Sequence, residues 1–162
     1  MFTLDELMAW TDEETTRWEA WFRERDLTVL ELPVGAGDRE PVRSLIAHIF
    51  IVEHRYADRL LGDEPVAYAA FPAMTIDEIF AIHGRARGRL RQWTASATPA
   101  EMDERLTFPT ITAGEFTASK RKIAAHALLH GVRHWAQIAT VLRQAGHPQP
   151  WMHDLLASSA LE

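Results

Sequence analysis

Apolar side chains in this chain recur at three- and four-residue spacings over four long stretches, which is the period of an amphipathic helix. The first stretch begins at Thr3 and the third at Thr75, and each start has a glutamate three residues later, which is a capping-box pattern. A glycine follows the second and the fourth stretches, as is common at helix ends. The pattern predicts long helices that begin at Thr3, near Pro41, at Thr75 and near Thr117, the last running to Gln144.

The segment between the third and fourth predicted helices, residues 105–117, has a different pattern. Threonine, phenylalanine and isoleucine alternate there with polar residues around an Ala-Gly pair, which is typical of extended chain or a loose hairpin. Pro109 argues against a central strand, because proline cannot donate to a hydrogen-bond ladder.

Two shorter elements complete the predicted fold. A capped helical turn is expected after Thr98, and a short C-terminal helix is expected to pack through Trp151, Leu155 and Leu156. The fold class is therefore all-α: a four-helix bundle with a short extended or hairpin-like segment before the last long helix and a short C-terminal helix. We expect a single domain over residues 1–162.

The fourth predicted helix carries two apolar stripes, which we expect to lie on nearly opposite sides. A helix that is apolar on both sides is buried on both sides. One side should face the core, and the other, with Trp135 at its middle, should be covered by a helix of the same chain or, preferably, by a two-fold mate. The first stripe contains Ile123, Ala127, His130, His134, Ile138 and Val141, and the second contains Leu128, Val132, Trp135, Ala139 and Leu142.

Histidines recur every fourth residue on this same helix, at His126, His130 and His134. In a helix, all three project from one side, about one turn apart. Imidazoles stacked in this way can close on one divalent metal, given a further ligand such as His48 on the apolar stripe of the second helix. The alternative is that they are solvated or core histidines.

The remaining histidines are weaker candidates. His54 is expected at the surface, and His83 is expected in the core or in a pocket of the third helix. His147 and His153, near the C-terminus, are expected to be solvated or structural.

Composition and charge narrow the function classes. The net charge of -6 argues against binding to nucleic acid or to an anionic membrane. No cysteine is present, so disulfides and thiolate ligands are excluded, and His, Asp and Glu are the strong metal ligands that remain. The N-terminal residues lack a basic region followed by an apolar run, and no stretch suits a membrane span, so we expect a cytoplasmic protein.

Two segments resemble the DinB/YfiT-like superfamily of four-helix bundles: SLIAHIFIVEHRYADRLL, which contains His48, and HALLHGVRHWAQIATVLRQAGHPQP in the fourth helix. The resemblance covers nearly the whole chain. It implies that His48, His130 and His134 hold a metal, that His126 lies near the site, and that the chain forms a homodimer. Characterised members of that superfamily include metal-dependent thiol S-transferases, which use a low-molecular-weight thiol, and a mycothiol-dependent isomerase.

The chain departs from the superfamily pattern beside the last metal ligand. Where members often have His-His-Arg-Gly-Gln, this chain has Arg133, His134, Trp135, Ala136 and Gln137. The metal histidine is kept, but the changed neighbours leave the substrate and the thiol open.

The predicted function is a divalent-metal-dependent thiol S-transferase or hydrolase that acts on a small molecule. His126 and Gln137, one turn on either side of the metal ligands, are the candidates for orienting the incoming group or moving its proton. Zinc or nickel is the expected metal, with iron as a third candidate. The alternative is a non-catalytic metal-binding bundle of a stress response. DNA binding is opposed by the acidic charge.

Overall fold

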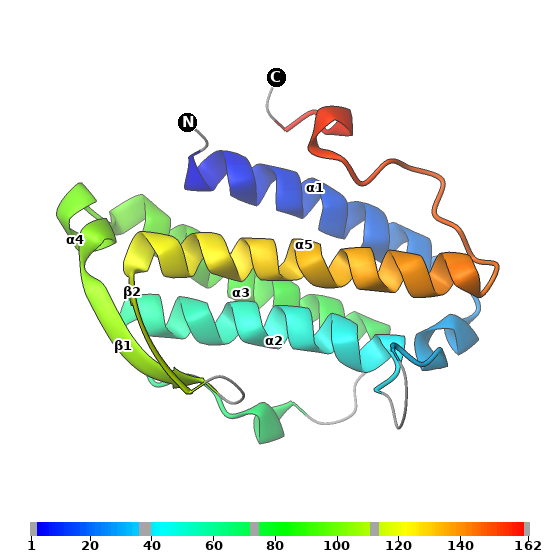
Figure 1. Ribbon diagram of the computed structural model, residues 1–162, viewed down its shortest axis with the longest axis horizontal. Coiled ribbons are helices and arrows are strands. Elements are labelled where there is room, and N and C mark those ends of the chain that lie inside the picture. Colours follow the sequence, from blue (N-terminus) through cyan, green and yellow to red (C-terminus); the bar gives the residue numbers. More distant parts are fainter. Residues whose placement is uncertain (1–2, 36–39, 72–74, 111–113, 161–162) are drawn as a thin grey trace.

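The fold is seen in a computed structural model, which describes residues 3–35, 40–71, 75–110 and 114–160 (Figure 1). Its four long helices are α1 (Leu4–Arg23), α2 (Val42–Leu61), α3 (Ile76–Ser96) and α5 (Lys120–Gln144). The short helix α4 (Pro99–Asp103) and the strands β1 (Arg105–Thr110) and β2 (Gly114–Ser119) separate α3 from α5. Short 3₁₀ turns are η1 (Leu27–Glu31), η2 (Tyr68–Ala70) and η3 (Leu155–Ala157).

The long helices lie side by side as a bundle, with α2 and α5 adjacent on the face that Figure 1 presents. The helix α2 packs mainly against α3 and α5, and α1 packs against α3 and α5. The β1–β2 ribbon crosses one end of this pair, and η2 lies beside α2. This arrangement confirms the predicted helical bundle with a hairpin before its last long helix.

The predicted helix starts are confirmed at Thr3 and Thr75, where both capping boxes form. A third capping box forms at Thr98 and begins α4. The helix α2 ends at Gly62, whose φ of 82° lies in the left-handed region that favours glycine. The long helix α5 begins at Lys120 and not near Thr117, because residues 117–119 complete strand β2 before the chain turns helical.

The strands β1 and β2 pair antiparallel, with Phe108 opposite Phe116. Pro109 lies opposite Glu115 in this two-stranded ribbon, in which each strand is an edge, so the missing N–H of proline is tolerated. The predicted Ala-Gly turn falls partly on residues 111–113, which lie outside the described residues.

The helix α5 buries one continuous face, and the expectation of two opposite buried sides was wrong. The two stripes are offset by single residues, which is only about 100° around a helix, so they merge into one broad face. The opposite side is exposed, and Leu129 on that side keeps 50% of its surface accessible. Trp135 is buried by a helix of the same chain: its ring stacks on Trp18 of α1 at a centroid distance of 4.9 Å. The expected cover by a mate is therefore wrong for Trp135, and the homodimer stays a prediction.

A buried polar layer separates the two hydrophobic clusters of the core. Arg87 of α3 is 3% exposed and lies between the carboxylates of Glu53 (Nε–Oε1, 3.2 Å) and Asp12 (Nε–Oδ1, 2.9 Å). Its Nη1 also donates to Thr11 at 3.1 Å. This layer joins α1, α2 and α3 through one guanidinium. The larger cluster includes Trp18, Phe22, Phe50 and Trp135, and the smaller includes Met8, Leu60, Leu90 and Trp93.

The C-terminal segment is held on α1 by two glutamates. The indole Nε1 of Trp151 donates to Glu14 at 3.2 Å, and His153 bonds to the same carboxylate and stacks on Trp18 at 5.3 Å. Ser158 Oγ donates to Glu13 at 2.5 Å. The predicted terminal helix is only the 3₁₀ turn η3, whose Leu156 is 99% exposed, so the expected packing of Leu156 was wrong.

Replacing Glu14 by alanine is expected to release this segment, because the carboxylate is the shared acceptor of Trp151 and His153. Unmet buried donors cost about 1–3 kcal/mol in folding free energy. Limited proteolysis should then cut within residues 147–160 faster than in the parent. The Glu24→Ala variant, at an exposed position, is the matched control. Equal cleavage of the parent and both variants would show that Glu14 does not hold the C-terminal segment on α1.

No helix in the described ranges is long and apolar enough to cross a membrane.

Candidate metal centre

Three imidazoles from two helices meet on the seam between α2 and α5. His48 lies in α2, and His130 and His134 lie one turn apart in α5. The ring centroid of His48 is 5.1 Å from each of the other two rings, and His130 and His134 are 4.4 Å apart. One nitrogen from each ring falls within 4.8 Å of the others, and all three residues are half-buried. We call this group the tri-histidine cluster.

The nitrogen spacing of the tri-histidine cluster fits a shared metal ion. Two nitrogens that each lie about 2.1 Å from one ion are separated by about 3.0 Å at a right angle and about 3.4 Å at the tetrahedral angle. The Nε2 atoms of His130 and His134 are 3.0 Å apart. The same donor set, three imidazoles without a thiolate, suits zinc, nickel or iron.

A close approach of the two helices beside the cluster depends on Gly131. A Cβ atom at this position would lie only 3.2 Å from Cγ2 of Ile49, the residue next to His48. Glycine therefore lets α5 lie close to α2 at the level where their histidines meet. Larger side chains here would push His130 away from His48.

Burial keeps the three rings neutral. The neutral imidazole is the form that binds metal. Burial lowers the pKa of His130 to about 3, with further contributions from the charges of His134 and His48. Burial also lowers the pKa of His48 and of His134. Each ring is therefore protonated less readily than a free imidazole, and protons compete less well with a cation for its nitrogen.

The side chain of Gln137 orients one of the rings. Its Oε1 lies 2.6 Å from Nδ1 of His134, and a carbonyl oxygen can only accept, so this nitrogen carries the proton. The Nε2 of His134 is then the free lone pair that faces His130. The Nδ1 of His130 is buried without a hydrogen-bond partner among the described residues.

Gln137→Leu is expected to weaken metal binding about 10-fold or more, because partners of this kind fix the ring and its tautomer. Gln137→Glu keeps an acceptor for Nδ1 and should retain the affinity. Gln144→Leu, further along α5 and exposed, is the control. The measurement is metal affinity by competition with a chromophoric chelator. Equal affinities for the Gln137→Leu variant and the parent would show that Gln137 does not orient His134 for metal binding.

His126 lies beside the cluster and does not join it. Its ring is 5.9 Å from that of His130 and is exposed, while the cluster of ligand atoms includes only the other three histidines. It packs against the edge of Tyr56 from α2 at 5.4 Å. The spacing of four residues placed all three α5 histidines on one side, but His126 lies one turn further along α5 than His130, where it meets Tyr56 and not His48.

Two tyrosines next to the cluster were not predicted from the sequence to be site residues. Tyr68 of η2 stacks on His48 at 6.4 Å, and Tyr56 covers His126. Tyr56 shares the apolar stripe of His48, which was a usable signal. Tyr68 comes from a 3₁₀ turn that no periodicity reveals.

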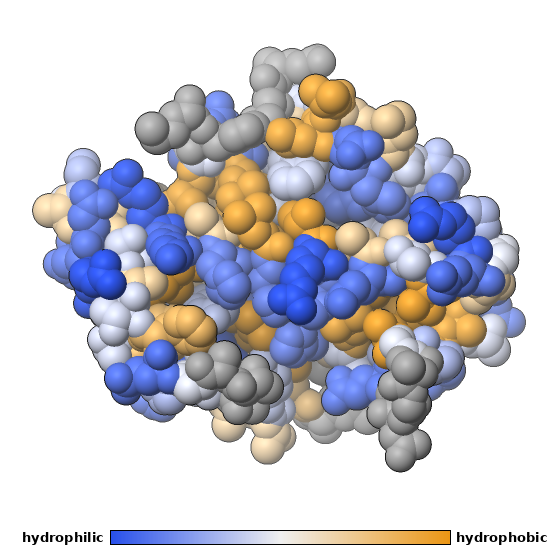
Figure 2. Space-filling model, in the orientation of Figure 1, coloured by the Kyte–Doolittle hydropathy of each residue, from blue (hydrophilic) through white to orange (hydrophobic). Residues whose placement is uncertain are grey.

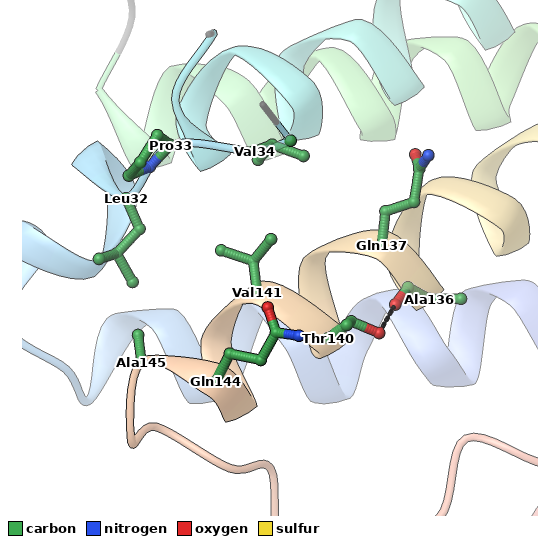
Figure 3. A pocket seen from close by; sticks show the side chains of 10 residues that line it. Leu32, Pro33, Val34, Ala136, Gln137, Thr140, Val141, Gln144 and Ala145 are labelled. Carbon is green, nitrogen blue, oxygen red and sulfur yellow. Dashed lines mark hydrogen bonds between the residues drawn. The ribbon is translucent and has the colours of Figure 1, made fainter. Parts of the chain in front are cut away.

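Two pockets lie near the tri-histidine cluster. One, of about 600 Å³, has His48, Tyr68 and Phe71 in its wall. The other, of about 730 Å³, lies between α5 and the segment after η1, and Gln137 stands at its edge (Figure 3). Val34 and Val141 point into this second pocket from opposite sides (Figure 3). Of the three cluster histidines, His48 thus borders a pocket large enough for a small molecule, and His130 and His134 line neither pocket.

Of two other histidines, one lies where it was expected and the other does not. His54 was expected at the surface, but it is 8% exposed, and its Nδ1 lies 3.2 Å from Asp58. A carboxylate one turn away allows a polar ring to be buried. His83 is half-buried as expected, with Nε2 3.7 Å from Asp12 and its ring against Phe50. Neither residue joins the tri-histidine cluster.

Comparison with known proteins supports the placement of the chain in a family. No curated protein matches the sequence. The model of the DinB family matches residues 1–160, which is nearly the whole chain. With a helical bundle, a hairpin before the last long helix and a three-histidine cluster between two helices, the chain belongs to the DinB family.

Proposed function

We propose that this protein is a metal-dependent enzyme that transfers a thiol to, or hydrolyses, a small-molecule substrate. The observation that carries the proposal is the convergence of His48, His130 and His134 at a half-buried position, with His48 in the wall of an open pocket. Among the described residues, no further His, Asp or Glu joins these three as a ligand. A protein ligand set of three leaves room for a substrate or water.

His48, His130 and His134 are the residues that would hold the ion. A divalent ion held by three neutral imidazoles keeps its positive charge and lowers the pKa of a bound thiol or water, which supplies a nucleophile near neutral pH. Gln137 positions His134 through their hydrogen bond and thus acts through that ring.

His126 is the candidate to carry the proton that the nucleophile loses. Its ring is exposed beside His130, so it can exchange protons with solvent. Burial lowers its pKa, and the charges of Lys122 and Arg133 lower it further, so the ring is neutral and able to accept at neutral pH. The proton then passes to the leaving group or to solvent.

The test is metal analysis of the purified protein followed by a screen of common low-molecular-weight thiols with an electrophile, and of esters with water. We expect turnover that requires the metal, ends on chelation and returns when metal is added. Turnover that survives both chelation and His130→Ala would show that the tri-histidine cluster is not the catalytic centre. A metal-loaded protein with no turnover and no exchangeable ligand would favour a non-catalytic metal-binding bundle.

A further inference from the structure

Two positively charged side chains follow the tri-histidine cluster along α2. Arg55 and Arg59 follow His48 by seven and eleven residues, spacings that place all three on one face of the helix. On this face, His48 meets His130 and His134 of α5, and the ring of Tyr68 lies against both His48 and Arg55. Figure 1 shows α2 and α5 running side by side here.

Both guanidinium groups are held in place by aromatic rings. The Cζ of Arg55 lies 4.9 Å from the ring of Tyr68, which itself stacks on His48. The Cζ of Arg59 lies 4.9 Å from the ring of Phe108 and 5.7 Å from that of Tyr56. One N–H of Arg55 also donates to the carbonyl of Val66, and one of Arg59 donates to the carbonyl of Arg55 at 3.3 Å. These contacts orient the two forks and leave other N–H groups available.

Neither guanidinium has an ion-pair partner in the part of the chain that the structure describes. The nearby carboxylate of Asp58 is taken by Arg89, at 2.7 Å, and Glu64 acts on Arg59 only from beyond ion-pair distance. Burial lowers the pKa of Arg59, and the charge of Arg55 lowers it further, so the two groups repel each other. Other arginines of this acidic protein are paired, among them Arg17, Arg23, Arg87, Arg89 and Arg91.

The opposite side of the seam is positive as well. Lys122 and Arg133 of α5 flank His126, and neither has an ion pair among the described residues. Figure 2 shows hydrophilic residues in a band over α5 on this face of the molecule. Glu31 and Glu40 line the 600 Å³ pocket together with His48, and Glu31 is bound to Arg43.

We propose that Arg55 and Arg59 bind the carboxylate or phosphate group of a small organic anion, which is the substrate of the tri-histidine site. The assignment of this anion as substrate rests on the proposed function, while the anion site itself does not. Planar guanidinium forks match the two oxygens of either group. The anionic end points along α2 toward Arg59, away from Glu40, and the reacting end lies at His48.

The test measures binding of malonate and of inorganic phosphate by calorimetry at low ionic strength, with malonamide as the uncharged probe. We expect both anions to bind and malonamide not to bind. Arg55→Gln and Arg59→Gln should each weaken binding about 10-fold or more, since each removes a charged hydrogen-bond donor. Arg59→Lys keeps the charge without the fork and should fall between. Arg85→Gln, at an exposed position of α3, is the control and should bind as the parent does.

The metal content of the same samples separates this inference from the proposed function. In His134→Ala, which should lack metal, anion binding at the two arginines should persist. If binding is lost in His134→Ala but unchanged in both Gln variants, the anion is a ligand of the metal and the arginine site is wrong. Equal binding by all variants would also overturn it. A parent without metal that binds anions through Arg55 and Arg59 would remove the proposed function and leave the anion site standing.

Discussion

The His134→Ala variant is expected to lose nearly all bound metal and all metal-dependent turnover. His134 supplies one of three imidazole nitrogens, with its Nε2 3.0 Å from that of His130. Loss of a partner outside the ligand set weakens metal affinity about 10- to 100-fold, so loss of a ligand itself should exceed that range. The fold should survive, because the residue is half-buried on a seam and not in either core cluster. Metal per chain, measured by elemental analysis after gel filtration, is the readout.

His147→Ala is the matched control for this variant, since His147 is an exposed histidine beyond the end of α5. It should keep the metal content of the parent. His126→Ala should also keep the metal, because its ring is outside the cluster, but it should slow turnover. Metal retained in His134→Ala, or lost equally in the control, would show that these histidines do not form the site.

The Arg87→Met variant is expected to be the most destabilised single substitution in the polar layer. It removes a buried guanidinium from between Glu53 and Asp12, and Glu53 is only 3% exposed. Breaking a buried ion pair from one side typically costs about 3–5 kcal/mol, because the remaining charge is left without compensation. Denaturant unfolding at pH 8 should show this loss as a lower midpoint.

Two further variants make this result specific. Glu53→Leu combined with Arg87→Met should recover much of the lost stability, since the stranded carboxylate is gone. Arg121→Ala removes an exposed pair with Asp103 and should change stability by less than about 1 kcal/mol. A double variant as unstable as Arg87→Met alone would mean that the loss comes from packing and not from the unpaired charge.

The carboxyl group of Glu53 should also make stability depend on pH in a recognisable direction. Burial raises its pKa from 4.5 to about 7, although Arg87 acts in the opposite sense. A pKa that is raised in the folded state contributes stability that is complete below pH 4.5 and is lost as the pH rises through about 7.

Glu53→Gln imitates the protonated acid at every pH, so comparison with the parent isolates this group from the titrating histidines. As the pH rises from 4.5 to 8, the stability difference between the variant and the parent should shift in favour of the variant by on the order of 3 kcal/mol, at 1.36 kcal/mol per pKa unit. Unfolding free energies measured across this range give the difference. A difference that is constant with pH would show that Glu53 is ionised throughout.

Local chemistry in the sequence determined most of the fold. Helix starts at Thr3, Thr75 and Thr98 were predictable because a capping box is made within four consecutive residues. The hairpin and the end of α2 at Gly62 were predictable for the same reason. The α5 histidines were also identified from their spacing, since periodicity alone places them on one side of a helix.

Contacts between distant segments were decided only by the tertiary structure. Which faces meet depends on how helices cross and on their relative register, and no single helix encodes either. The uniform spacing does not separate His126 from His130 and His134. Only the family resemblance implied that His130 and His134 bind the metal while His126 lies beside it. The packing of α2 on α5 brings His48 to His130 and His134 and leaves His126 outside.

The same limit explains the predictions that were wrong. Trp135 is covered by Trp18, which lies far away in the chain, so its own helix could not show what buries it. His54 is buried because Asp58 accepts a hydrogen bond from its ring, and Asp58 is itself held by Arg89 of another helix. Sequence periodicity therefore determined which residues share a face, and only the three-dimensional packing decided which faces, charges and rings meet.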